Sequence, residues 1–284
     1  MTEHKLEMAT EFIRVHPDAA ARVLELQNPE QVTSLITDLD GEIVGPLLQV
    51  MLPRFVGQIC LGLDARTTAS LLAHVEISSA AAILRFLDKR EREAVLSRLS
   101  SKKRAGCILL LSYPQDSVGA WMTPEVVTLP DDCTLESAKN YVDIAGEVIK
   151  SDYLYVVKRN RELVGRVSYI EIMRGDRKRD LQAYINTDLA GLYGRMSIQN
   201  AFQQECWSLV DVMPVVNRNQ QFVGAIRHVD LRKGMEQLNR KPEKDSPVNP
   251  LSGIFEAYAT TLLTLVNSLD EVFADDKSSQ REQK

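Results

Sequence analysis

The sequence lacks a surplus of positive charge. Its 284 residues carry 34 lysines and arginines against 39 aspartates and glutamates, which gives a net charge of −5. Binding to nucleic acid needs clustered cations that neutralise phosphates. The charge balance therefore predicts a protein that has no nucleic-acid partner.

Paired cysteines, long hydrophobic runs and catalytic motifs are also missing from the sequence. The four cysteines form no C-x-x-C pair, which argues against a disulfide framework or a zinc ribbon. No run approaches the ~18 apolar residues that cross a bilayer, and the charged start MTEHKLEMATEF has no signal-peptide core. We therefore expect a cytoplasmic protein without a membrane span. No nucleophile elbow, zinc-protease motif, P-loop or dinucleotide fingerprint occurs, so we do not expect an enzyme.

A twelve-residue repeat runs through residues 17–100, with units that begin at 17, 29, 41, 53, 65, 77 and 89. The seventh and eighth residues of every unit are apolar, and several units add an apolar residue at the fourth or eleventh position. These offsets place the side chains on one face of a short helix. Helices of this length are marginal alone, so the pattern predicts a superhelix of stacked short helices that acts as a spacer or docking surface.

A longer repeat follows, in which LYVVKRNRELVGRVSYIEI (154–172) aligns with MPVVNRNQQFVGAIRHVDL (213–231) at a separation of 59 residues. Thr134 and Ser197 precede the helical segments as N-caps. Asn160 and Asn219 suit hairpin turns because asparagine tolerates the left-handed conformation. Each half is therefore predicted to run strand, helix, strand, turn, strand, helix, and the two halves to pack as one pseudo-symmetric unit.

These strand ends, each followed by [S/T/R]-x-x-[D/E], resemble a tandem CBS (Bateman) module. The segment YPQDSVGAWMTP (113–124) is similar to the YP-x-D-S-A-G-x-x-M-T-P signature of MgtE magnesium transporters, with departures at Val118 and Trp121. The short helices before it are similar to the MgtE amino-terminal superhelix. The resemblance covers residues 12–238 and implies a relative of the MgtE cytosolic region. The ion-conducting membrane domain of that family has no counterpart in this sequence.

The resemblance implies adenine-nucleotide binding, of ATP or AMP, in the cleft between the CBS halves. Carried over by position, the candidate nucleotide-binding residues are Gly165, Ser168, Glu171, Gly224, Arg227 and Asp230. The acidic residue would hold the ribose hydroxyls, and Ser168 or Arg227 would meet phosphates. The alternative is purely structural, since Ser168 and Glu171 have capping-box spacing and Asp230 suits a first helical turn.

Magnesium is the second ligand that the resemblance implies, through carboxylates gathered between domains. Asp40, Asp64, Asp88, Asp131 and Asp132 form no local motif with octahedral oxygen ligation, and solvated or capping roles are the simpler interpretation of each. The metal site is left unassigned.

The carboxyl-terminal part predicts a linker followed by an amphipathic helix. Residues 239–250 are polar and carry prolines, whereas residues 251–274 place apolar side chains at spacings of four and three, as in a helix that pairs with another helix. No basic residue lies between 251 and 276, which favours a protein partner over a membrane surface. The partner is expected to be a second copy in a homodimer, or a separate membrane or effector protein.

The predicted fold class is multidomain α and α/β. It comprises a superhelix of short helices (1–112), a junction (113–124), a tandem CBS pair (125–238, with halves at about 125–180 and 181–238), a linker (239–250), an amphipathic helix (251–274) and a disordered tail (275–284). The predicted function is a non-catalytic regulatory sensor. The alternatives are a ligand-free interaction scaffold and a detached cytosolic subunit of a magnesium transport system.

Overall fold

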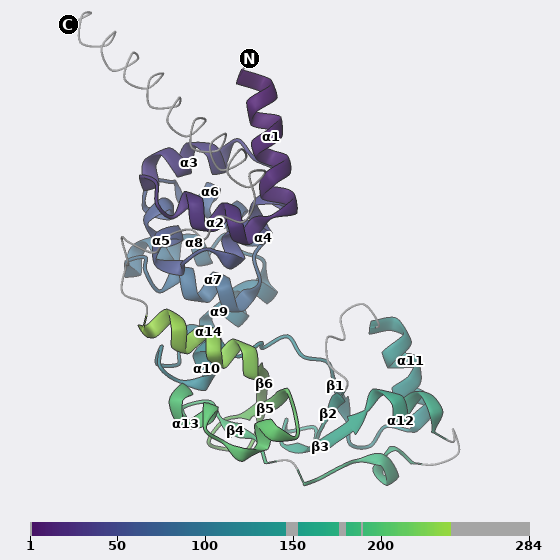
Figure 1. Ribbon diagram of the computed structural model, residues 1–284. Coiled ribbons are helices and arrows are strands. Elements are labelled where there is room, and N and C mark those ends of the chain that lie inside the picture. Colours follow the sequence, from purple (N-terminus) through teal and green to yellow (C-terminus); the bar gives the residue numbers. More distant parts are fainter. Residues whose placement is uncertain (1, 146–152, 176–179, 189, 240–284) are drawn as a thin grey trace, which may run out of the picture. The chain divides into compact units, whose positions relative to one another are not determined.

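The computed structural model describes residues 2–145, 153–175, 180–188 and 190–239 (Figure 1). The chain divides into two compact units between Cys107 and Ile108, inside helix α9 (Ser101–Leu111). The predicted linker, amphipathic helix and tail lie outside the described residues. Among the described helices, none is long and apolar enough to cross a membrane.

The amino-terminal unit is a stack of short helices, and the twelve-residue repeat is confirmed. After α1 (Thr2–Val15), each helix from α2 to α8 begins at the first residue of its repeat unit. These helices are α2 (Pro17–Leu24), α3 (Pro29–Thr37), α4 (Gly41–Val50), α5 (Pro53–Leu61), α6 (Ala65–Ala73), α7 (Ile77–Leu84) and α8 (Lys89–Leu96). Pro29 and Pro53 stand in the first turn of their helices, where the missing N–H costs no hydrogen bond.

Each helix of this stack packs against the next but one, as the pairs α2 with α4, α3 with α5, α4 with α6, α5 with α7 and α6 with α8 show. The side chains at the seventh and eighth repeat positions are buried, except that of Val23, which is half-buried. One fully buried Leu or Val contributes about 1.5–3 kcal/mol relative to its exposed state. The shared apolar face therefore stabilises helices that would be marginal on their own.

Side chains also satisfy the helix ends in this stack. Asp64 accepts hydrogen bonds from the backbone N–H groups of Arg66 and Thr67, and Asp88 forms a capping box with Glu91. Asp64 and Asp88, two of the aspartates considered for magnesium binding, therefore serve as helix caps, which is the simpler role expected for them.

The second unit contains two three-stranded sheets, one in each half of the longer repeat (Figure 1). The first half comprises β1 (Thr128–Pro130), α11 (Leu135–Ala145), β2 (Tyr153–Val157), β3 (Leu163–Ser168) and α12 (Tyr169–Arg174). A 3₁₀ turn, η1 (Leu181–Tyr184), follows it. The second half comprises β4 (Leu192–Tyr193), α13 (Ile198–Phe202), the 3₁₀ turn η2 (Glu205–Ser208), β5 (Val212–Val216), β6 (Phe222–Arg227) and α14 (His228–Asn239). The short helix α10 (Val118–Trp121) precedes both halves. The predicted fold class, a superhelix of short helices followed by an α/β module of two halves, is confirmed for the described residues.

Corresponding strands pair in the same way in the two halves. The first strand is parallel to the second, and the second is antiparallel to the third, in both sheets. The hairpins share a register irregularity, at Val156/Val157 in one half and at Val215/Val216 in the other, which again are 59 residues apart. Thr134 and Ser197 accept hydrogen bonds from the third residue after each of them, so the predicted N-caps are confirmed.

One detail of the hairpin prediction is wrong. The left-handed residues are Arg161, with φ of 69°, and Gln220, with φ of 59°, each directly after the predicted asparagine. Asn160 instead accepts a hydrogen bond from the N–H of Glu162 with its side chain. This side-chain bond fixes the turn and leaves the next residue to adopt the positive φ.

Candidate functional site

The two halves of the second unit exchange short segments. Thr123, which precedes the first half, pairs with Ala225 of β6 through two backbone hydrogen bonds of 2.7 and 3.0 Å. Asn186, which precedes the second half, pairs with Arg166 of β3 through bonds of 2.8 and 3.0 Å. Each sheet is therefore extended by the segment that leads into the other half.

Gly165 and Gly224 permit this exchange. A Cβ on Gly165 would meet the backbone oxygen of Asn186, and one on Gly224 would lie 2.6 Å from the backbone oxygen of Thr123. Both contacts are with main-chain atoms, which cannot rotate away as a side chain does. Two of the six predicted nucleotide-site residues are thus required by the backbone, whether or not a ligand binds.

The halves meet again at their hairpins. Leu163 donates its N–H to Gln220, and Phe222 donates to Arg161, at 3.2 and 2.7 Å. The 59-residue spacing makes these two bonds equivalent to each other, because Leu163 corresponds to Phe222 and Arg161 to Gln220, as a two-fold relation requires. Beside them Tyr155 packs on Phe222, with ring centroids 5.1 Å apart. We call Tyr155, Val157, Phe222 and Ala225 the inter-half cluster.

Ser168 and Glu171 form the predicted capping box at the start of α12. The Glu171 carboxylate accepts a hydrogen bond from the Ser168 N–H at 3.3 Å, and Ser168 caps the third residue of the helix. Both side chains therefore already have backbone partners, and the structural alternative for this pair is present in the structure.

Arg227 and Asp230 bond to each other. Nε of Arg227 lies 2.7 Å from one oxygen of Asp230, and Nη2 lies 2.9 Å from the other. The Asp230 side chain is 16% exposed and that of Arg227 is 46% exposed. Asp230 occupies the first turn of α14, as expected. The two donors of Arg227 that were expected to bind a phosphate instead bind the Asp230 carboxylate.

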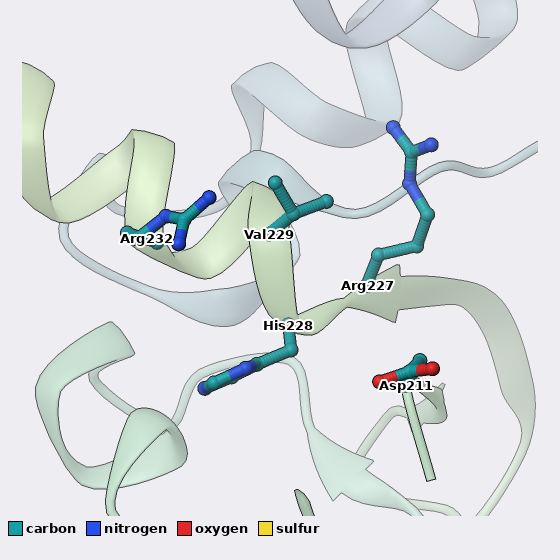
Figure 2. Close-up of a pocket in the computed structure, with 5 residues that line it drawn as sticks. All are labelled: Asp211, Arg227, His228, Val229 and Arg232. Atoms are coloured by element: carbon teal, nitrogen blue, oxygen red, sulfur yellow. The ribbon is translucent and has the colours of Figure 1, made fainter.

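A pocket of about 220 Å³ adjoins this ion pair. Figure 2 shows that its lining comes from three places: Arg227 at the end of β6, His228, Val229 and Arg232 on α14, and Asp211 just before β5. The Arg227 guanidinium points away from the Asp211 carboxylate in this view. Small-molecule sites are typically larger, about 300–1,000 Å³. The pocket fits a group of phosphate size, and its arginines suit an anion.

His228 is held by two aromatic rings rather than by metal-type ligands. Its imidazole stacks on Phe202 and on Trp207, with centroid distances of 4.6 and 5.0 Å. The Trp207 indole N–H donates to the backbone oxygen of Ala201 at 2.6 Å, which fixes its ring. This stack anchors the start of α14 to α13.

Arg166 is the residue that the sequence interpretation missed. It lies on β3 two residues before Ser168, and its guanidinium carbon stands 4.2 Å above the centroid of the Tyr153 ring. Its Nε and Nη1 atoms are enclosed and have no hydrogen-bond acceptor among the described residues. One feature of the sequence could have drawn attention to it: Arg166 stands on a predicted strand at the position where the second half has Ala225, 59 residues later.

The junction 113–124 is a structural clamp on the second half. The Tyr113 ring fills a notch beside Gly119 and Gly194, where a Cβ would lie 2.5 and 2.7 Å from the ring. Burial raises the pKa of Tyr113. Val118 is fully buried and donates its N–H to Met196 at 2.9 Å. The junction thus packs against the start of the second half.

Trp121, the larger departure from the family signature, is matched by Gly234 of α14. A Cβ on Gly234 would lie 2.9 Å from the indole ring, so the glycine makes room for the tryptophan. The indole N–H donates to the backbone oxygen of Gln115 at 2.7 Å.

The part of the chain that the structure describes contains no group of three or more His, Cys, Asp or Glu side chains with metal-binding geometry. Asp132 instead pairs with Arg159 at 2.9 Å, and this guanidinium lowers the pKa of the carboxyl group. Burial raises the pKa of Cys60 to about 12 and that of Cys107 to about 11, so both are packing residues rather than thiolate ligands.

Comparisons with known sequences relate this chain to MgtE proteins. Residues 15–116 match the family model of the MgtE intracellular N domain. The magnesium transporter MgtE of Bacillus subtilis (strain 168) is 27% identical over 237 residues, which is 79% of this chain and 48% of that protein. The chain therefore spans about half the length of this curated relative.

Two solved structures share the fold. The crystal structure of the soluble part of a magnesium transporter has a TM-score of 0.59 and 19% identity, and covers 84% of this chain and 100% of that one. The cytosolic domain of the Mg²⁺ channel MgtE in complex with ATP has a TM-score of 0.55 and 20% identity, and covers 75% and 93%. The resemblance to the cytosolic region of MgtE, with its N domain followed by a CBS pair, is thereby confirmed.

Proposed function

We propose that this chain is a non-catalytic regulatory module of magnesium transport, which binds an adenine nucleotide, ATP or AMP, between the halves of its CBS pair. The observation that carries the proposal is the combination of an MgtE N-domain match with the fold of a cytosolic domain solved in complex with ATP. The exchange of segments also supports the proposal. Because each sheet includes a segment that leads into the other half, a ligand bound between the halves would contact a structure that both halves build.

The nucleotide-binding residues of this proposal are Gly165, Ser168 and Glu171 in the first half and Gly224, Arg227 and Asp230 in the second. A ribose hydroxyl can donate to a carboxylate that already accepts a backbone N–H, since each carboxylate has several lone pairs. Glu171 therefore retains acceptor capacity. Asp230 already accepts the bidentate fork of Arg227, so a ligand at the second half has to open or compete with this ion pair.

The described residues do not present a ready magnesium site. Mg²⁺ needs several oxygen ligands in octahedral order, and no cluster of acidic side chains supplies them in the described ranges. The proposed role of magnesium is therefore tested by adding Mg²⁺ to the chain and measuring its effect.

Regulation would follow from a difference in affinity between two arrangements of the chain. A nucleotide shifts such a balance only to the extent that it binds one arrangement better. We further propose that the chain acts in the cytoplasm as a homodimer, because closed two-fold dimers are the commonest assembly. No nucleic-acid partner is proposed.

Isothermal titration of the purified chain with ATP, AMP and Mg²⁺ tests the proposal. We expect saturable heat with at least one nucleotide, weakened in Glu171→Gln and in Asp230→Asn. No heat, together with no shift in melting temperature for any ligand, would overturn it. A stable complex with another protein that survives mutation of Arg227 and Asp230 would then favour the interaction scaffold.

A second candidate function follows from the coverage of the curated relative. Because the chain spans about half of a magnesium transporter, we propose that it works together with a membrane-embedded transport unit. Co-purification of a membrane protein with the tagged chain from native membranes supports this candidate. Recovery of the tagged chain only in the soluble fraction, without such a protein, contradicts it.

A further inference from the structure

Arg166 projects away from the hydrophobic core of the first half. Its neighbour Val167 is buried in that core, so the alternation of β3 places Arg166 on the opposite face. On that face it stands directly across from Tyr155 of β2, which belongs to the inter-half cluster. Ser168 follows on the same face two residues later.

The guanidinium of Arg166 has an aromatic contact but lacks acceptors at two of its nitrogens. The centroid of the Tyr153 ring lies 4.2 Å from its guanidinium carbon, while Nε and Nη1 are enclosed and find no hydrogen-bond partner in the described part of the chain. By contrast, Arg14, Arg159 and Arg227 each contact a carboxylate. Among the described residues, no carboxylate forms an ion pair with Arg166.

Such a group is costly to keep. A buried donor without an acceptor loses hydrogen bonds that water would supply, and the loss is larger for a charged group. The second half carries Ala225 at the equivalent position, buried and free of this cost. The fold therefore does not require an arginine here, and a ligand would account for it.

We propose that Arg166 is an anion-binding residue whose missing acceptors are supplied by the phosphate oxygens of a nucleotide bound at the first half. The proposal rests on the proposed function and names the group that recognises the ligand's charge. Guanidinium is the side chain best suited to phosphate, and its stacking on Tyr153 orients it. Since Arg166 as a whole is only half-buried, its long side chain can turn its donors toward a ligand.

The test compares ligands with and without phosphate on three versions of the full chain: wild type, Arg166→Met and Arg159→Met. Methionine retains an apolar stem against Tyr153 but removes the charge and the donors. Arg159→Met removes the same charge from an exposed arginine that pairs with Asp132. We expect R166M to weaken ATP binding by about tenfold or more, because hydrogen bonds to a charged group are lost. Adenosine affinity should remain the same in all three proteins.

Equal losses of ATP and adenosine affinity in R166M, or no loss of either, would overturn the proposal. If R166M does not fold, Arg166→Gln is measured by the same criteria.

Inorganic pyrophosphate separates this proposal from the proposed function. If the wild type binds no nucleotide, the proposed function fails, and the melting temperature with pyrophosphate decides the role of Arg166. A rise in the wild type that is absent in the variant supports an anion site, whereas the same response in both contradicts it.

Discussion

The two halves of the CBS pair share a backbone but differ in the chemistry of their facing side chains. Both extend their sheets with a segment from the other half, and both place a glycine beneath it. Yet in the first half two nitrogens of Arg166 have no acceptor within the residues that the structure describes. The second half has Ala225 at that position and pairs Arg227 with Asp230. The two halves therefore share one backbone frame, while differences at single positions decide which half has donors without acceptors in the described ranges.

The largest expected effect tests whether equivalent positions pack equivalently. Phe222 is buried in the inter-half cluster, whereas Leu163, its equivalent in the first half, is half-buried. Phe222→Ala should lower the free energy of unfolding of the second unit by about 3–5 kcal/mol, and Leu163→Ala by less. Urea unfolding followed by tryptophan fluorescence measures this unit selectively, because Trp121 and Trp207 both lie in it. Equal losses of unfolding free energy in the two variants would contradict this, because they would mean that Leu163 and Phe222 stabilise the contact between the halves equally.

The next effect tests the part of the comparison in which the halves agree. Gly165→Ala and Gly224→Ala should each cost about 1–3 kcal/mol, since the added methyl group meets backbone oxygen in both. Gly62→Ala is the control. Gly62 lies in the amino-terminal unit, and its added Cβ would lie 3.4 Å from the nearest atom, which is an ordinary contact. This substitution should leave the fluorescence transition unchanged. A loss at only one of the two CBS glycines would break the proposed symmetry.

A smaller effect separates capping from ion pairing. Ser168→Ala should cost about 1 kcal/mol because it removes a helix cap. Arg227→Met removes a partly exposed ion pair, typically worth 1 kcal/mol or less, so we expect it to cost less. The same fluorescence-monitored urea transition measures both. A larger loss for Arg227→Met would show that its pair with Asp230 is a structural element of the second half.

The smallest effect concerns pH. The Asp132–Arg159 pair of the first half has no counterpart in the second, since Arg195 stands at the position equivalent to Asp132. Hydrogen bonding to Arg159 lowers the pKa of Asp132 in the folded state. Its stabilising effect is therefore present above the unfolded pKa of about 3.9 and is lost as the pH falls through the folded value. The stability difference between wild type and Asp132→Asn should shrink over that range. A difference that persists at still lower pH would contradict the assignment.

Local features of the fold were predictable from sequence, and contacts between distant segments were not. The helix starts at Pro29 and Pro53, and the caps at Thr134 and Ser197, follow from patterns a few residues long. The closure of Arg227 on Asp230 was missed although it is local, because the family motif suggested a ligand for both residues. Periodicity also carries no information about which acceptors surround a strand residue, so the state of Arg166 required its neighbours across the sheet.

The central claim is that the first half of the CBS pair offers the open site for a nucleotide phosphate. Hydrogen–deuterium exchange of the full chain with and without ATP tests it most directly. We predict slower exchange on ATP binding in residues 163–168 and 180–188, with a smaller change in residues 222–230. Protection confined to residues 222–230, or no protection in either half at saturating ATP, would contradict the account.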